Sequence, residues 1–309
     1  MIPFIKDEDT QGPSVHHPSA NLIRVVADNA GPFTYTGTGT YILHMAETCV
    51  VIDPGPMIEN HVDRLVSAIG QRRVEAILVT HTHKDHSPAS NALKDRTGAP
   101  IWGCTKTETP SREASSAMDE SLDETYAPDK ILSDGEVLPF DAGTLRVFAT
   151  PGHLSNHLCY FWQEEAALFS GDHVMGWATS VVIPPDGHMG SYMASLAKTL
   201  DLAPEIIWPT HGQPITNTTP FIKALIKHRE AREDSILTQI QGGNGQVMNI
   251  VKALYTDIPQ ALYPAAAQSV FAHIIHLIEK QQILAPKGFS ITDEFRSASQ
   301  RQSAQNLQR

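Results

Sequence analysis

The stretch Thr80-His81-Thr82-His83-Lys84-Asp85-His86 decides how this 309-residue chain is interpreted. It follows the apolar run Ala76–Val79, which is typical of a buried strand. It places three imidazoles and a carboxylate within six residues, and these are side chains that bind a borderline divalent cation such as zinc. The alternative is a polar loop in which histidines cluster without a metal. The rest of the chain must therefore supply further ligands.

Composition favours a globular enzyme without a membrane span. Hydrophobic residues make up 41% and charged residues 18% of the chain, and no apolar run reaches the roughly 20 residues that a membrane-spanning helix needs. The first ten residues contain Asp7, Glu8 and Asp9 but no basic start followed by an apolar stretch. We therefore expect no signal peptide, no membrane association and a cytoplasmic location.

The cysteines and the net charge argue against a disulfide-rich protein and against a general nucleic-acid-binding protein. Cys49, Cys104 and Cys159 are odd in number, far apart and without CxxC spacing, so we expect reduced, buried side chains rather than a disulfide framework. The net charge of -11 argues against a general nucleic-acid surface. However, residues 221–309 hold 10 basic and 7 acidic side chains. This mildly basic end keeps a polyanionic partner open.

Several other segments have the patterns of strands and helices. Strands are expected at residues 21–27, 40–45, 49–52, 99–103 and 157–162, and helices at 61–70, 87–96 and 192–200. Residues 105–130 are rich in polar side chains and predict a solvated excursion.

Candidate ligands follow strand-like runs elsewhere in the chain. Such runs at 76–79, 143–148, 166–170 and 206–208 are followed within a few residues by His81, His153, Asp172 and His211, respectively. Strand ends that meet at one edge of a sheet are a common way to carry a site on loops over a rigid core. Asp53 also ends a strand-like run, and it is either a turn former or a carboxylate that orients a ligand histidine.

In this order, the Asp and His residues resemble the HxHxDH hydrolases of the metallo-beta-lactamase superfamily over about residues 20–215. The resemblance implies an α/β fold, a four-layer αββα sandwich, and two divalent metal ions. It assigns one ion to His81, His83 and His153, the second to Asp85, His86 and His211, a bridging role to Asp172, and an outer carboxylate to Asp53. Zinc is expected, with iron or manganese as alternatives. The implied chemistry is attack on an ester-type bond by a hydroxide held between the ions, with Asp85 and Asp172 as the catalytic carboxylates.

The subgroup is indicated by Asp172, which stands where the true zinc beta-lactamases have cysteine and so counts against antibiotic hydrolysis. Residues 150–157 and 169–176 resemble the beta-lactamase-like protein 2 group. That group includes a mitochondrial endoribonuclease for single-stranded RNA and relatives that hydrolyse acyl-carrier thioesters. Because an acidic protein repels a polyanion, we favour an acyl ester or thioester on a small molecule or carrier. RNA hydrolysis and a ligand-responsive DNA-binding regulator are the alternatives.

Four side chains lie near the proposed ligands in sequence without belonging to the set. His157 could reach the pocket as a hydrogen-bond donor, and His188 and Tyr192 are predicted to contact substrate by their place in the implied fold. His173 directly follows Asp172. We expect it to face away from the ligands and to pack in the interior.

The last third of the chain predicts a small winged-helix-like domain. Apolar spacing indicates helices near residues 219–240, 247–254 and 270–278, followed by a hairpin pairing 283–284 with 289–291. We therefore expect a hydrolase domain at 1–218, the small domain at 219–295 and a disordered tail at 296–309. The recognition-helix candidate, 265–280, has Lys280 as its one Lys or Arg, so a structural or gating role is favoured over DNA binding. The oligomeric state is left open.

Overall fold

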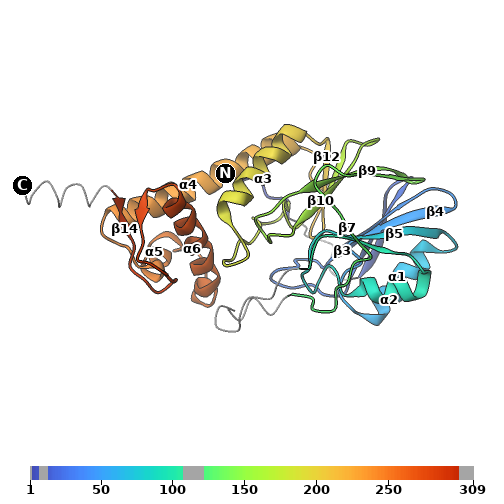
Figure 1. The fold of residues 1–309 in the computed structure, drawn as a ribbon, viewed down its shortest axis with the longest axis horizontal. Helices are drawn as coiled ribbons and strands as arrows, with labels where there is room; N and C mark the ends of the chain where they lie inside the picture. Colours follow the sequence, from blue (N-terminus) through green and yellow to red (C-terminus); the bar gives the residue numbers. More distant parts are fainter. Residues whose placement is uncertain (1, 7–12, 107–121, 299–309) are drawn as a thin grey trace, which may run out of the picture.

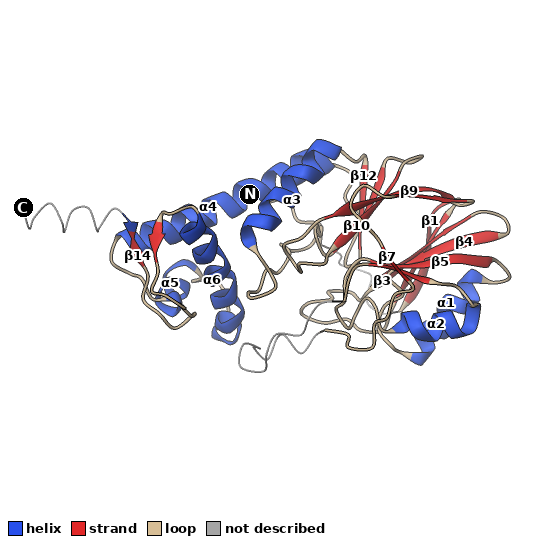
Figure 2. Cartoon of the chain, viewed as in Figure 1, coloured by secondary structure: helices blue, strands red, loops and turns tan. Residues whose placement is uncertain are grey.

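Two β-sheets packed face to face, with helices outside each, form the larger part of the protein (Figures 1 and 2). The structure is a computed structural model that describes residues 2–6, 13–106 and 122–298. A smaller, mostly helical domain follows at the carboxyl end and is reached through one long helix (Figure 1). The predicted four-layer αββα architecture is confirmed.

The first sheet has seven strands in the order β1 to β7. They are β1 (Ser14–Ser19), β2 (Leu22–Val26), β3 (Gly39–His44), β4 (Thr48–Ile52), β5 (Arg73–Val79), β6 (Ile101–Gly103) and β7 (Lys130–Ile131). Pairing is antiparallel from β1 to β4 and parallel from β4 to β7. Helices α1 (Glu59–Ile69) and α2 (Ala89–Thr97) connect the parallel strands and pack against the sheet. Since both of its faces are covered, β4 is buried along its whole length.

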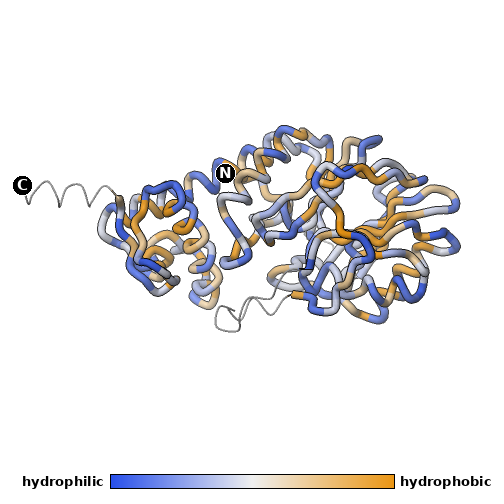
Figure 3. Tube along the Cα trace, viewed as in Figure 1, coloured by the Kyte–Doolittle hydropathy of each residue, from blue (hydrophilic) through white to orange (hydrophobic). Residues whose placement is uncertain are grey.

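The second sheet has five strands in the order β12-β11-β10-β9-β8. They are β8 (Val137–Phe140), β9 (Gly143–Ala149), β10 (Leu158–Trp162), β11 (Ala167–Gly171) and β12 (Ile206–Pro209), and α3 (Met189–Leu202) connects β11 to its parallel neighbour β12. Apolar residues of both sheets fill the space between them, and a second core lies between this sheet, α3 and the next helix. Figure 3 shows these apolar residues along the strands.

The carboxyl-terminal domain has a core of its own. It contains α5 (Val247–Leu254), a short 3-10 helix η2 (Gln260–Leu262), α6 (Tyr263–Glu279), β13 (Ile283–Leu284) and β14 (Arg296–Ser297). The long helix α4 (Thr218–Gln241) belongs to both parts, since Phe221 packs in the core beside α3 whereas Ile236 and Ile240 pack in the small domain. The boundary predicted at residue 218 thus coincides with the start of this shared helix.

One prediction for this domain is wrong. Strand β13 pairs with Arg296–Ser297, not with residues 289–291. Phe289 and Ile291 instead contribute side chains to the domain core, and apolar content alone does not distinguish such packing from a strand. Arg296 and Ser297, predicted to begin a disordered tail, instead form β14. The rest of that predicted tail, 299–309, lies outside the described residues, as does most of the polar segment 105–130.

Helix α6 is a long, largely apolar helix of the small domain. Within the described residues, Gln260–Glu279 is the segment long and apolar enough to cross a membrane. Its buried side chains, Val270 and Ile274 among them, pack in the domain core together with α5 and α4. Its apolar character is accounted for by this packing.

Candidate metal centre

The candidate ligands follow the ends of strands in both sheets. His81 to His86 follow β5, His153 follows β9, and Asp172 directly follows β11. His211 comes two residues after β12. The structure thus brings together, at one edge of the sandwich, all seven residues that the sequence proposed as ligands.

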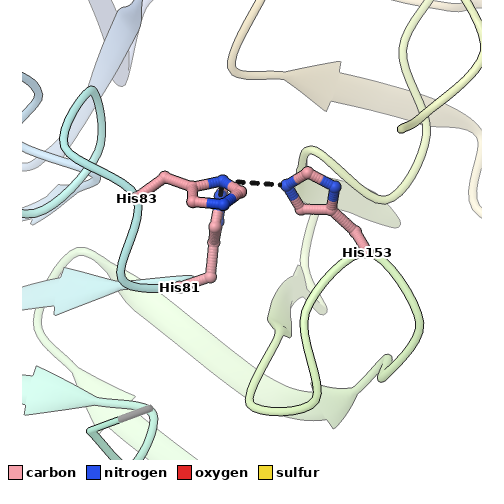
Figure 4. Close-up of side chains that lie close together, drawn as sticks. All are labelled: His81, His83 and His153. Carbon is pink, nitrogen blue, oxygen red and sulfur yellow. Dashed lines mark hydrogen bonds between the residues drawn. The ribbon is translucent and has the colours of Figure 1, made fainter. Parts of the chain in front are cut away.

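Three histidines form one part of the site, the three-histidine cluster His81, His83 and His153 (Figure 4). The Nδ1 atom of His83 lies 3.0 Å from Nε2 of His81 and 3.0 Å from Nε2 of His153. Burial lowers the pKa of His83 to about 3 and that of His81 well below its usual value. His81 and His83 are therefore neutral near pH 7, which is the form that binds a metal ion.

The second part is the carboxylate–histidine cluster Asp85, His86 and His211. The Asp85 carboxylate lies 3.1 Å from His211 Nε2 and 3.5 Å from His86 Nε2. Burial raises the pKa of the Asp85 carboxyl, but the facing histidines outweigh it and hold the pKa well below its usual range. For His86 and His211 burial acts in the opposite direction and lowers the pKa. The facing carboxylates outweigh burial, however, and raise the pKa of both histidines.

Asp172 lies between the two clusters. Its Oδ1 is 3.5 Å from His86 Nε2 and 3.4 Å from His211 Nε2, and its Oδ2 is 3.8 Å from His153 Nε2. Three buried atoms here, His86 Nε2, His211 Nε2 and Asp172 Oδ1, have no hydrogen-bond partner among the described residues. Buried polar atoms without partners are costly. Their convergence fits divalent cations, with the N and O donor set that zinc, iron and manganese use.

Asp53 lies behind the carboxylate–histidine cluster and contacts it through His86. Its Oδ2 is 2.9 Å from His86 Nδ1, the nitrogen opposite the candidate ligand atom. Asp53 also accepts hydrogen bonds from the backbone N–H and the hydroxyl of Thr80, both at 2.8 Å, and from the Thr210 hydroxyl at 3.1 Å. The carboxylate is thus held in place and in turn orients the imidazole.

Two of the three predicted substrate contacts are wrong. His157 is fully buried; its Nδ1 lies 2.8 Å from the Thr150 hydroxyl, and its Nε2 accepts the Asp172 backbone N–H at 3.2 Å. Tyr192 is also fully buried, and its hydroxyl donates to the His173 carbonyl at 3.1 Å. The polar atoms of both side chains are used inside the protein, so neither is available to a substrate.

His188 lies at the start of helix α3, and His173 packs against that helix. His188 is the N-cap of α3, and its Nε2 lies 2.8 Å from the Glu279 carboxylate of the small domain. The substrate contact predicted for His188 stays a prediction. His173 is buried with its Nε2 3.0 Å from the Thr199 hydroxyl, which confirms its predicted packing role.

The sequence patterns did not single out the supporting threonines or Gly171. Thr80 and Thr210 each directly precede a candidate ligand histidine, and this adjacency is the signal that could have identified them. Gly171 has φ +51°, and an added Cβ would lie 2.7 Å from His157 Nε2 and 2.8 Å from the Thr80 hydroxyl. Only glycine therefore lets β11 approach the centre this closely.

Comparison with known families gives a match for each of the two parts of the chain. Residues 37–211 match the Metallo-beta-lactamase superfamily, and residues 247–287 match the Beta-lactamase associated winged helix domain. Among curated proteins, the chain is similar to the Beta-lactamase-like protein 2 homologs of Caenorhabditis elegans and Drosophila melanogaster. Identity is 32% over 81% of this chain and 81% of the first relative, and 30% over 92% and 96% for the second.

Solved structures show a similar fold. A Beta-lactamase domain protein from Burkholderia ambifaria has a TM-score of 0.75 at 18% identity, covering 94% of this chain and 96% of that one. The protein TTHA1623, solved in a di-iron-bound form, has a TM-score of 0.50 at 27% identity, covering 62% of this chain and 93% of that one. The family match, the curated relatives and the Asp and His cluster lead to one conclusion: the chain belongs to the metallo-beta-lactamase superfamily and is a metal-dependent hydrolase that carries a carboxyl-terminal winged-helix domain.

Proposed function

We propose that this protein is a dinuclear hydrolase of acyl esters or thioesters. The observation that carries the two-ion assignment is the position of Asp172, whose two carboxylate oxygens face different clusters. In this proposal the three-histidine cluster holds one ion and the carboxylate–histidine cluster holds the other. TTHA1623, solved in a di-iron-bound form, supports the same number of ions.

The chain's own residues define what each side of the centre does. When bound, the ions would supply a water of lowered pKa and polarise the oxygen of the scissile bond. Asp53 holds His86 through Nδ1 and so fixes the direction of its Nε2. Asp172 and Asp85 would bring negative charge to bound ions and so reduce the repulsion between them.

Cysteine thiols do not offer a competing nucleophile. Cys49, Cys104 and Cys159 are buried and free, and burial raises the pKa of each thiol to about 12. A thiol with such a pKa is neutral near pH 7, and the thiolate is the nucleophile. The reaction is therefore assigned to the metal centre.

The charge distribution supports an acyl substrate over RNA. The net charge is -11, so the protein as a whole repels a polyanion. At the end of α6, the ammonium of Lys280 donates to the Glu233 carboxylate at 2.7 Å. This cation is already neutralised within the protein, which leaves the winged-helix part with little positive charge along α6 for a phosphate backbone.

The direct test is turnover by protein reconstituted with Zn²⁺, Fe²⁺ or Mn²⁺ in turn. The substrates are short- and medium-chain thioesters, lactones and a labelled single-stranded RNA. We expect metal-dependent hydrolysis of the thioesters or lactones that a chelator abolishes. RNA cleavage without acyl hydrolysis would replace the proposed substrate, whereas specific, salt-sensitive DNA binding without any turnover would favour the regulator.

A further inference from the structure

The loop between β11 and α3, residues 172–188, connects the metal centre to the carboxyl-terminal domain. Near its middle, the carbonyl oxygen of Val181 accepts a hydrogen bond from His153 Nδ1 at 2.6 Å. The other ring nitrogen, Nε2, faces His83 in the three-histidine cluster. Because a hydrogen bond to one imidazole nitrogen orients the other, the position of this carbonyl sets the direction of a candidate ligand atom.

The residue before Val181 is held from α4. Arg229, which is 5% exposed, donates from Nη2 to the Ser180 carbonyl oxygen. Its guanidinium also lies over the Tyr192 ring, 5.2 Å from the centroid. Fixing the Ser180 carbonyl fixes the plane of the 180–181 peptide, and the next carbonyl along the chain is the one that holds His153.

The electrostatics of Arg229 point to a role beyond general stability. Among the described residues, no carboxylate lies within 4.0 Å of its guanidinium, and its Nε has no hydrogen-bond partner. A buried cation in this setting is costly compared with an apolar side chain of similar size. The hydrogen bond that it donates to Ser180 goes to the loop that orients His153.

The small domain is also anchored at the end of the same loop. One turn after Arg229, Glu233 lies 2.7 Å from His276 Nδ1 and so ties α4 to α6. Helix α6 in turn places Glu279 against His188 at the start of α3. At Gly190 an added Cβ would lie 3.1 Å from the His276 ring, so the two elements are in close approach.

We propose that Arg229 is a positioning residue for the metal centre, through which the helix shared with the winged-helix domain sets the metal affinity of the three-histidine cluster. The chain of contacts runs from Arg229 to Ser180, through the adjoining peptide to Val181, and on to His153. The inference rests on the proposed function, since it requires that the cluster bind a metal ion. It gives the carboxyl-terminal domain a role at the centre that needs no nucleic acid.

The test is a titration of metal-free full-length protein with Zn²⁺, repeated with Co²⁺, whose absorption reports its ligands. R229M removes the hydrogen bond and the charge, whereas R229K keeps a cationic donor. R232M is the matched control, because Arg232 lies on the same helix but contacts Leu254 and Tyr255 within the small domain. We expect R229M to weaken one of the two binding steps by about 3- to 10-fold, less than the 10- to 100-fold typical of a direct partner of a ligand.

Comparison among the variants separates positioning from a loss of folding. The weakened step should be the one that H153A removes, R229K should restore most of the affinity, and R232M should bind as the wild type does. If R229M does not fold, R229Q is expected to show the same weakened step. Unchanged affinity in R229M, or equal losses in R229M and R232M, would overturn the inference. Failure of the wild-type protein to bind metal would instead overturn the proposed function.

Discussion

The two clusters of the candidate centre differ in how they balance charge. In the three-histidine cluster, the imidazoles face one another at 3.0 Å, and burial keeps the pKa of His81 and His83 low. In the carboxylate–histidine cluster, Asp85 faces protonatable histidines that it stabilises in the charged form. His81 and His83 of the first cluster are uncharged, whereas the histidines of the second cluster favour the protonated, charged form. The two should therefore respond differently to mutation, metal and pH.

The largest effect is expected from D172A, because Asp172 faces both clusters. Hydrolysis should fall by more than the roughly 10- to 100-fold typical of losing an outer partner, and at least one ion should be lost. Metal analysis together with turnover measures both quantities. The matched control is D141A, which removes an exposed carboxylate and should leave activity unchanged. Wild-type activity in D172A would contradict a shared ligand.

A smaller effect, mainly on the carboxylate–histidine cluster, is expected from D53N. Asp53 accepts from His86 and from both hydroxyls of Thr80 and Thr210, whereas the amide offers one acceptor oxygen and two donor hydrogens. Metal affinity of the carboxylate–histidine cluster should fall by roughly 10- to 100-fold, and that of the other cluster should change little. Calorimetric titration checks this, with D63N, a change of an exposed side chain on α1, as the control. Equal weakening of both steps would remove the distinction between the clusters.

Proton release should also distinguish the clusters at pH 7. The raised pKa values of His86 and His211 keep protons on these rings until a metal ion displaces them. The lowered pKa values of His81 and His83 mean that these rings release none. Titrations in buffers of different ionisation enthalpy should show more proton release in one binding step than in the other. Greater release in the step that H153A removes would contradict the assignment.

The last prediction concerns the pH dependence of stability in the metal-free protein. For His81 and His83, the folded pKa lies below the unfolded value of about 6.5. Below that pH the unfolded chain binds protons that the folded chain excludes. Each such ring should therefore lower the free energy of unfolding by up to ~1.4 kcal/mol for every unit by which the pH is lowered. The opposite sign holds for His86 and His211, whose contribution is complete below pH 6.5 and is lost as pH rises through their folded pKa.

Urea denaturation with a chelator present, between pH 5 and 8, measures this dependence. We expect maximal stability near pH 6.5. The carboxylates with lowered pKa, such as Asp85, do not affect this window because their unfolded pKa is near 3.9. Stability that rises steadily from pH 6.5 to pH 5 would show that the buried histidines accept protons in the folded state.

The main strands and helices could be predicted because their apolar runs coincide with burial. Strand β4, for example, is apolar from Cys49 to Ile52 and is buried throughout. Strand β1 was missed because its residues are mostly polar and almost all exposed, so an alternation of apolar and polar residues cannot be recognised there. The partner of β13 was also missed, because pairing between short strands depends on tertiary packing that a local pattern does not contain.

The proposed ligands could be predicted better than the residues around them. Side chains such as His83 and Asp172 carry metal chemistry in their type and spacing, and strand ends placed them at one edge. The directions in which the surrounding side chains and backbone carbonyls point could not be predicted in the same way. Tyr192 is buried, and its hydroxyl bonds to a backbone carbonyl. The carbonyl of Val181 belongs to a residue whose side chain gives no indication of its role.

The most direct test of a two-ion centre is a crystal structure of the zinc-loaded protein with anomalous scattering recorded on both sides of the zinc edge. We predict two anomalous peaks, one against His81, His83 and His153 and the other against Asp85, His86 and His211. Asp172 should contact both. A single peak in fully loaded crystals, or two peaks of which one lies away from these residues, would contradict the account.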